Sequence, residues 1–206
     1  MSTLAINEPP SAVLDWEHME DDVVAIPYVN QVNHKFFPEE FLCHLYARMK
    51  RDQSVDIVFP SAGGYTLNTF IAEMKDKCPL TFWRREGDNL VELLGFSWLQ
   101  TIEGAPGQRK ASIGFCYFRH EAWGAAKTLT CSRVGLRYYF KMLEVNVIFR
   151  AMLRHNTLGR RHAAKIGFKL VAEIPRFLPG PDGLQAAVLV MLEREAFMAG
   201  DSRSTV

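Results

Sequence analysis

The segment 111–168 constrains the fold of this chain more than any other. It contains two stretches typical of β-strands, 111–118 and 145–153, joined by a loop of small residues and a long helical pattern, 125–143. Where a helix begins directly after a strand, its first backbone N–H groups are unpaired and the positive end of its dipole faces the loop. Small residues there let an anion approach the backbone. The sequence therefore predicts a phosphate-type anion site at this junction.

Two further pieces follow the second strand. Asn156 precedes a short helical pattern, and that pattern ends in Lys-Ile-Gly-Phe at 165–168. Alone, each piece has an ordinary structural explanation, because many loops are small and Gly often ends a helix in the left-handed conformation. Their order and spacing together are hard to obtain by chance.

These parts resemble the acyl-CoA site of the GNAT acyltransferase superfamily, in particular its ribosomal-protein N-terminal acetyltransferase branch. The phosphate loop of that family is Gln/Arg-x-x-Gly-x-Gly/Ala, and residues 121–126 (Glu-Ala-Trp-Gly-Ala-Ala) match two of its three defined positions. The family has Asn at the end of its fifth strand and Lys-Leu-Gly-Phe nine to twelve residues later, as Asn156 and 165–168 do with one conservative change. Residues 111–115 and 192–197 resemble the branch's Ala-Glu-Ile-Gly-Tyr and its final strand, so the resemblance covers about residues 80–197.

The length of the chain favours a single domain over residues 1–206, and the composition predicts a loose arm at 1–11 and a disordered tail at 200–206. The resemblance implies an α/β (α+β) fold for this domain. Its mixed, mostly antiparallel sheet is split between the fourth and fifth strands and flanked by helices. Acyl-CoA would lie in the split, with pantetheine along the fourth strand and pyrophosphate at the helix start. The cofactor contacts implied in this way are Cys116, Tyr117, Phe118, Arg119, Trp123, Gly124, Ala125, Ala126, Lys127 and Asn156.

The chain departs from the family at its proton carriers. The branch often has Glu before Ile-Gly-Tyr, Ser three residues after the Asn or Tyr seven after it; here these positions are Ser112, Gly159 and Ala163. Glu121 also places a carboxylate beside the expected pyrophosphate. We therefore expect catalysis to depend mainly on proximity, with His155 as the main proton carrier. Ser112 would relay through a water, and Tyr117 would serve as the acid.

The first functional hypothesis is an N-acyltransferase that moves an acetyl group from acetyl-CoA to a primary amine, such as a protein N-terminus, a polyamine-like metabolite or an aminoglycoside. The alternative is a catalytically weak GNAT-fold module that binds acyl-CoA or a protein partner, which the missing acid and base favour. A third hypothesis is an RNA-directed acyltransferase acting on charged tRNA. In this fold the acceptor is selected by segments that correspond to 38–51, 66–77 and 175–183, and none of them names a chemical class.

Basic residues gather around Asn156, and three explanations stay open for them. They form a solvated helix face, contact the phosphates of CoA, or bind RNA. No aromatic residue is interleaved with them, so we favour the cofactor. The cluster comprises Arg150, Arg154, His155, Arg160, Arg161, His162 and Lys165.

Composition sets limits on partners and location. The net charge of +1 gives no bulk attraction to nucleic acid or to anionic membranes, and no apolar run approaches the roughly 20 residues of a membrane span. The N-terminus lacks the features of a secretory signal. The four cysteines have no metal-ligand spacing, so we expect buried, reduced thiols in a cytoplasmic protein without metal, a monomer or homodimer. They are Cys43, Cys78, Cys116 and Cys131.

Periodicity predicts the remaining elements. Helices are expected at 38–51 and 66–77, and further strands at 23–26, 80–84, 90–100, 168–174 and 184–193. An apolar stripe on helix 125–143 should pack on the sheet; it consists of Cys131, Val134, Tyr138 and Met142. Acidic residues near the first strand either attract a cationic amine or form a solvated turn; they are Asp15, Glu17, Glu20, Asp21 and Asp22.

Overall fold

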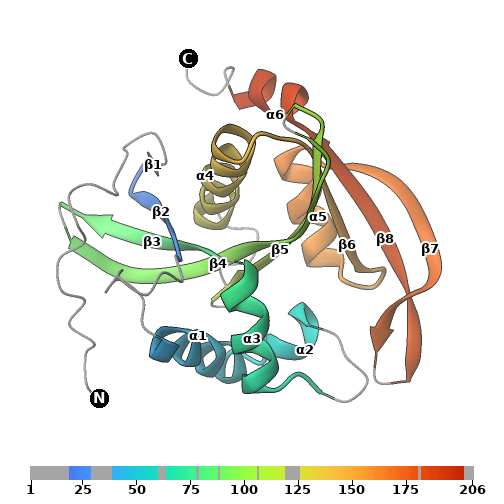
Figure 1. Ribbon diagram of the computed structural model, residues 1–206, viewed down its shortest axis with the longest axis horizontal. Coiled ribbons are helices and arrows are strands. Elements are labelled where there is room, and N and C mark those ends of the chain that lie inside the picture. The colour runs from blue at the N-terminus through green and yellow to red at the C-terminus, as the bar shows by residue number, and fades with distance from the viewer. Residues whose placement is uncertain are drawn as a thin grey trace.

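A computed structural model describes residues 19–28, 39–59, 64–77, 79–87, 89–105, 107–118, 126–180 and 182–201. One eight-stranded sheet crosses the molecule in the order β1-β2-β3-β4-β5-β6-β8-β7. Helices α1, α2 and α3 cover one face of the sheet, and α4, α5 and α6 lie on the other (Figure 1). Within the described residues, no helix has the length and apolar character needed to cross a bilayer.

The strands are β1 (Met19–Glu20), β2 (Val23–Pro27), β3 (Leu80–Glu86), β4 (Asn89–Glu103), β5 (Arg109–Tyr117), β6 (Val145–Leu153), β7 (Lys169–Gly180) and β8 (Gly183–Glu193). The helices are α1 (Glu39–Arg51), α2 (Val55–Val58), α3 (Leu67–Lys77), α4 (Ala126–Met142), α5 (Thr157–Ile166) and α6 (Arg194–Asp201). Every helix and strand that the sequence predicts is present within a few residues of its expected bounds.

The sheet opens between β5 and β6. These two strands form its one parallel pair among the described residues, and their pairing ends at Ser112 and Phe149. Beyond that point β5 continues to Tyr117 and β6 to Leu153 without pairing to each other. The predicted split between the fourth and fifth expected strands is therefore confirmed. These strands are labelled β5 and β6 because the short β1 was not among the expected strands.

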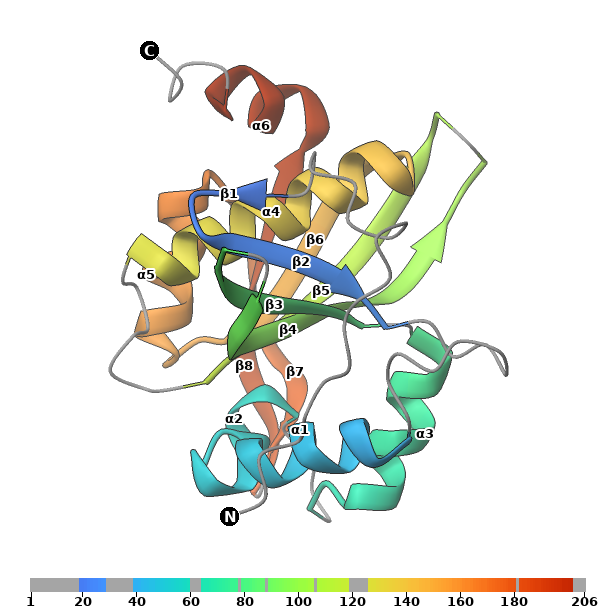
Figure 2. The same cartoon turned by 90° about the vertical axis from the view of Figure 1, so that its left-hand side faces the viewer.

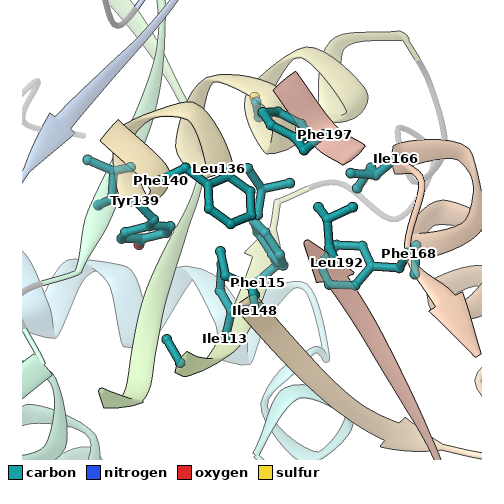
Figure 3. Packing of buried hydrophobic residues seen from close by; sticks show 14 of the residues in the cluster. Ile113, Phe115, Leu136, Tyr139, Phe140, Ile148, Ile166, Phe168, Leu192 and Phe197 are labelled. Atoms are coloured by element: carbon teal, nitrogen blue, oxygen red, sulfur yellow. The ribbon is translucent and has the colours of Figure 1, made fainter. Parts of the chain in front are cut away.

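Two apolar cores hold the sheet. One lies between the sheet and helices α4 to α6, where Phe115, Phe140 and Ile148 meet Leu192 and Phe197 (Figure 3). The other lies under α1 to α3 and is rich in aromatic rings, including Phe96 and Trp98. Because both faces of β4 and β5 are covered, alternate side chains of these strands enter different cores.

The predicted stripe on α4 is partly wrong. Cys131 and Val134 are buried as expected, but Met142 is 54% exposed. The helix instead approaches the sheet at Gly135, where an added Cβ would lie 2.8 Å from the ring of Phe82. A count of apolar residues overlooks a glycine, although its small size is what lets the helix pack closely.

The C-terminal elements also differ from expectation. The strand expected at 168–174 is longer than predicted, because β7 continues to Gly180, which pairs with Gly183 at the start of β8. The stretch 192–197, expected within the final strand, instead contains the end of β8 and the start of α6 at Arg194. Of the predicted tail, 200 and 201 belong to α6, whereas 202–206 and the arm 1–11 lie outside the described residues.

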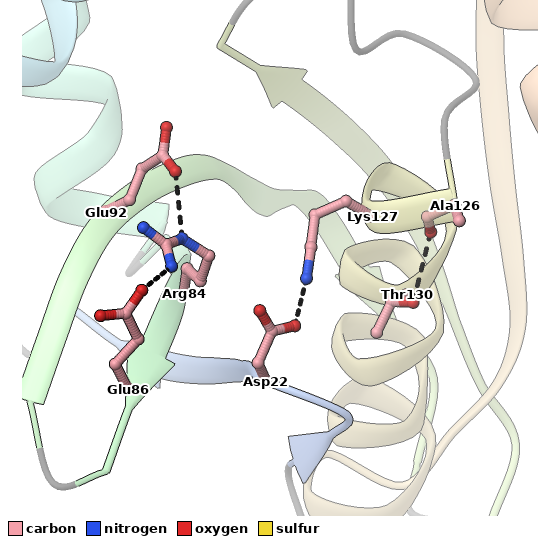
Figure 4. Close-up of polar contacts among 7 residues, drawn as sticks. All are labelled: Asp22, Arg84, Glu86, Glu92, Ala126, Lys127 and Thr130. Atoms are coloured by element: carbon pink, nitrogen blue, oxygen red, sulfur yellow. Dashed lines mark hydrogen bonds and ion pairs between the residues drawn. The ribbon is translucent and has the colours of Figure 1, made fainter.

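Two of the acidic residues near β1, Glu20 and Asp22, form ion pairs with α4, whereas Asp21 is exposed and Asp15 and Glu17 lie outside the described residues. Asp22 pairs with Lys127 in the first turn of α4 (Figure 4). Glu20 pairs with Arg137 at 3.0 Å and with Arg133 at 3.6 Å. The hydrogen bond from Lys127 lowers the pKa of the Asp22 carboxyl. These carboxylates therefore join β1 and β2 to α4, so Glu20 and Asp22 are not free to attract an amine.

Candidate functional site

The opening between β5 and β6 contains a cavity of about 150 Å³. Its walls come from the unpaired parts of both strands, from the start of α5 and, on the opposite face of the sheet, from α2, β4 and β7. Most of the lining is apolar. The described lining residues are Ile57, Val58, Trp98, Gln100, Ile113, Gly114, Phe115, Cys116, Tyr117, Arg150, Ala151, Met152, Leu153, Asn156, Leu158, Gly159, His162 and Leu178.

Asn156 fixes the start of α5 at the cavity. Its side-chain Oδ1 accepts a hydrogen bond of 2.8 Å from the N–H of Gly159, which is an N-cap contact. At the other end of the helix Gly167 adopts φ 108°, and the N–H groups of Gly167 and Phe168 both bond the carbonyl of Ala163. This is the ordinary helix-ending role of glycine. The two sequence motifs thus set the length and position of α5.

A buried chain of polar groups connects three elements beside the cavity. The hydroxyl of Tyr117 on β5 hydrogen-bonds the hydroxyl of Ser132 on α4. Ser132 Oγ in turn lies 2.8 Å from Nε2 of His162 on α5. Tyr117 and His162 both line the cavity, while Ser132 is fully buried behind them.

Burial controls the protonation of this chain. It raises the pKa of Tyr117 well above its usual value, so the phenol keeps its proton. It also lowers the pKa of His162 to about 4, and the charges of Arg150 and Lys165 add to that effect. The imidazole is therefore neutral at pH 7. The chain can pass a proton between Tyr117 and His162 without holding a net charge at rest.

Arg150 is the only charged side chain among the described lining residues. Its guanidinium carbon lies 5.3 Å from the centre of the Phe115 ring, a cation–π geometry. Burial lowers the pKa of the guanidinium, although an arginine this far above neutrality stays charged. No hydrogen bond or ion pair joins Arg150 to another described residue. The cavity wall therefore carries one positive charge that no carboxylate of the described residues balances.

Two other lining side chains have defined chemistry. Burial raises the pKa of the Cys116 thiol to about 12, so it is protonated at neutral pH and is not a nucleophile there. The indole N–H of Trp98 is buried and donates to no described atom. A buried donor without a partner is costly, and a ligand oxygen would satisfy it.

The comparisons with known proteins agree on one fold. The chain resembles Mycobacterium smegmatis RimJ in complex with CoA-disulfide, with a TM-score of 0.64 and 16% identity over 88% of this chain and 89% of that one. It resembles a GNAT-family acetyltransferase from Bacillus anthracis with a TM-score of 0.62 and 15% identity over 85% and 96% of the two chains. The chain also resembles the Microcin C7 self-immunity acetyltransferase MccE in complex with acetyl-CoA and AMP. The TM-score is 0.62 and the identity 11%, over 84% of this chain and 93% of that one.

This chain has the GNAT fold. No family model matches its sequence, and no curated protein does so either. In the GNAT fold of this chain, β5 and β6 are the two strands that diverge, and α4 is the helix that follows the first of them. Figure 2 shows the beginning of α4 next to α5, at the open end of the split.

The cofactor residues implied by the resemblance fall into three groups. Cys116, Tyr117 and Asn156 line the cavity. Phe118 is buried in the core on the α1 side, and its N–H bonds the carbonyl of Leu94. Ala126 and Lys127 form the first turn of α4, where Ala126 is exposed and Lys127 pairs with Asp22. Arg119, Trp123, Gly124 and Ala125 lie outside the described residues, as does Glu121.

The three residues expected to transfer protons are not together. Tyr117 lines the cavity, but Ser112 is at its edge and donates to Gln100 Oε1 at 2.9 Å. His155 is exposed on the turn before α5 and is not among the described lining residues. The role of His155 stays a prediction. Sequence reasoning named Arg150 and His162 only as members of the basic cluster around Asn156, and it did not select Ser132.

The basic cluster divides into two sets. Arg150 and His162 face the cavity, whereas Arg154 pairs with Glu173 at 3.2 Å and Arg160 donates to the carbonyl of Arg154 at 3.3 Å. Arg161 and Lys165 are exposed. Within the described part of the chain, no group of three His, Cys, Asp or Glu side chains could hold a metal ion.

Proposed function

We propose that this protein is an N-acyltransferase that moves an acetyl group from acetyl-CoA to a primary amine. The observation that carries the proposal is the cavity between the diverging strands β5 and β6, which lies where the two strands no longer pair with each other. An extended chain such as pantetheine can hydrogen-bond to a free strand edge in the way an added strand does. The crystallised neighbours RimJ and MccE, named as complexes with CoA-disulfide and acetyl-CoA, support this choice of ligand.

The residues present fit such a ligand. The edge of β5 from Ile113 to Cys116 no longer pairs with β6 and offers backbone groups, and the unpartnered indole N–H of Trp98 offers a donor for a carbonyl oxygen. At the open end, the first turn of α4 contains no acidic residue that would repel a pyrophosphate. Asn156 uses only its Oδ1 for the cap, so its amide N–H₂ group can bind a ligand carbonyl.

Amide formation requires a C–N bond to form at the thioester carbonyl and the C–S bond to break. The amine loses one proton and the departing thiolate gains one, so the net proton count is unchanged. The cavity holds the two reactants together, which can supply roughly 7–11 kcal/mol of the barrier reduction. The protonated phenol of Tyr117 is the acid we assign to the thiolate, because it is the one hydroxyl among the described lining residues.

The Tyr117–Ser132–His162 chain would restore that proton. With the imidazole hydrogen on Nε2, Ser132 can donate to the phenolate oxygen of Tyr117 while it takes the Nε2 proton. Nδ1 would take up the proton released by the amine in the same step, so that the imidazole stays neutral. A positioned acid or base of this kind typically contributes 10²–10⁴-fold to the rate. The chain therefore replaces the proton carriers that the resemblance expects at 112, 159 and 163.

Replacing Tyr117 tests this assignment. We expect Tyr117→Phe to lower kcat at least 100-fold, in assays of acetyl-CoA with a panel of primary amines, while acetyl-CoA affinity measured by calorimetry changes less than threefold. The matched control is Tyr139→Phe, which also removes a buried tyrosine–serine bond, 2.9 Å to Ser97, but lies outside the cavity lining. Both variants should lose about 1 kcal/mol of stability. Equal kcat in the two variants would remove Tyr117 from the mechanism.

The catalytically weak binding module is the second candidate. The observation that favours it is the absence of a carboxylate or a basic imidazole among the described cavity residues, since His162 is held neutral with a pKa of about 4. Binding of acetyl-CoA without turnover of any amine would support this candidate. A folded protein whose melting temperature does not change in excess acetyl-CoA would contradict both.

A further inference from the structure

The positive charge of Arg150 has no use in the proton chain, and its surroundings point to a ligand. It is the one charged group among the described residues of a mostly apolar cavity wall, and no described carboxylate reaches it. Its contact is the face of Phe115, which holds the guanidinium but does not neutralise it. A charge placed in apolar surroundings is costly unless an anion accompanies it. The missing anion would come with whatever fills the cavity.

The position of Arg150 along β6 separates the two ends of the site. Pairing between β5 and β6 ends at Phe149, so Arg150 is the first residue past the point where the strands part. Asn156, at the open end, is six residues further along the chain. After Arg150, β6 continues for three residues to Leu153, which is roughly 10 Å of strand, and the turn that contains Asn156 follows. The backbone of Arg150 is therefore nearer than Asn156 to the point where the strands part.

The neighbours of Arg150 belong to the reacting end. Phe115 and Tyr117 are two residues apart on β5, so their side chains lie on the same face of the sheet. On β6, Arg150 lies between Ile148 and Met152 on that same face. Beside the larger effect of burial, the positive charge of Arg150 also acts to lower the pKa values of Tyr117 and His162. A thioester whose sulfur lies near the Tyr117 hydroxyl would thus direct its acyl group toward the guanidinium.

We propose that Arg150 binds a carboxylate at the end of the donor's acyl group, so that the preferred donor is the CoA thioester of a dicarboxylic acid of the malonyl or succinyl type. This inference rests on the proposed acyl-CoA site and names the class of acyl group that it takes. A planar guanidinium binds a carboxylate through two parallel hydrogen bonds, which an ammonium group does not reproduce. Acetyl-CoA, whose acyl group ends in a methyl, leaves the guanidinium without an anion and is the weaker donor.

Calorimetry with two thioesters of equal chain length tests the proposal without an acceptor. Succinyl-CoA and butyryl-CoA each have a four-carbon acyl group, and only the former ends in a carboxylate. The parent protein should bind succinyl-CoA at least tenfold more tightly than butyryl-CoA. Arg150→Gln should remove this preference while leaving butyryl-CoA affinity within threefold of the parent. Arg150→Lys, which keeps the charge but loses the planar fork, should retain part of the preference.

A second arginine serves as the control. Arg133→Gln removes the same charge from α4, where Arg133 pairs with Glu20 outside the cavity lining, and it should keep the parent preference. Equal affinities of the parent for the two thioesters, or a preference that survives in Arg150→Gln, would overturn the proposal while the acyl-CoA site stands. If no thioester binds to the folded parent, the proposed function itself fails. These two failures are distinguished by acetyl-CoA, which binds in the first case only.

Discussion

The two walls of the cavity are built differently. The β5 wall is paired along its whole length to β4 and is covered by apolar cores on both faces, with Phe115 on one side and Cys116 on the other. The β6–α5 wall holds Arg150, Asn156 and His162, and its polar groups depend on a short helix that begins at one cap. One wall therefore supplies rigid backbone, and the other supplies most of the ionisable and amide groups. Apart from Tyr117, which we assign to catalysis, changes on the β5 wall should affect stability, and changes on the β6–α5 wall should affect binding and the pH dependence of stability.

We expect the largest loss of stability from a substitution in the β5 wall. Phe115 is 5% exposed, and its ring lies 6.0 Å from that of Tyr117. Phe115→Ala should lower the free energy of unfolding by about 3–5 kcal/mol, because it leaves a cavity in the core. Denaturant unfolding measures the change. The control, Phe177→Ala, removes a phenylalanine of β7 that is 46% exposed, and it should cost less than about 0.5 kcal/mol. Similar losses in both variants would mean that the β5 wall is not the stabilising one.

The second prediction concerns the β6–α5 wall, where His162 should make the stability of the protein depend on pH. His162 has a pKa of about 4 in the folded protein, below the usual 6.5, so the unfolded chain takes up a proton first as the pH falls. The stability that comes from the neutral imidazole is complete above pH 6.5 and is lost progressively down to about pH 4. Over that window the parent should lose about 3 kcal/mol more than His162→Asn does.

Chemical unfolding at several pH values measures this difference. His44→Asn is the control, because His44 is exposed on α1, and its pH profile should follow that of the parent. A His162→Asn profile parallel to the parent profile would show that the imidazole is not held neutral by its surroundings.

The sequence predicted the β5 wall better than the other wall. Strand 111–118 and helix 125–143 were recognisable because apolar residues recur at the periods of a strand and of a helix. Asn156 was recognisable because a cap and a following helix leave a local pattern. Ser132 was missed, and Arg150 and His162 were not told apart from the rest of the basic cluster, because the three residues come from three elements that are brought together only by tertiary packing. One signal was available in the sequence. Strand alternation places Arg150 on the same face as Ile148 and Met152, which predicts an arginine among buried apolar side chains.

The choice of His155 over His162 shows the limit of such reasoning. Both histidines follow β6 within ten residues, and nothing local distinguishes them. His162 is 6% exposed because it faces inward on the first two turns of α5, whereas His155 is in the turn that precedes the helix. The rotation of α5 on the sheet decides between them, and that rotation is set by contacts far away in the sequence.

The smallest effect should come from the cap that positions the polar wall. Asn156→Ala should lower stability by about 1 kcal/mol, because it removes the bond to the Gly159 N–H. If the amide also binds the ligand, acetyl-CoA affinity should fall at least fivefold in calorimetry. Thr66→Ala is the matched control, since Thr66 Oγ1 accepts a bond of 3.2 Å from the N–H of Thr69 at the start of α3, away from the cavity. It should cost similar stability without loss of affinity. Unchanged affinity in Asn156→Ala would limit Asn156 to a structural role.

The short parallel pairing of β5 with β6 has a consequence for how such a site persists over evolutionary time. Past Ser112 and Phe149 both strands present main-chain donors and acceptors to the opening, and every amino acid except proline supplies the same pair of groups. A recognition surface made of peptide bonds does not depend on which side chains flank it. Chains that share 10–18% of their residues with this one keep the same fold. An opening lined by peptide groups therefore tolerates many substitutions among the side chains beside it.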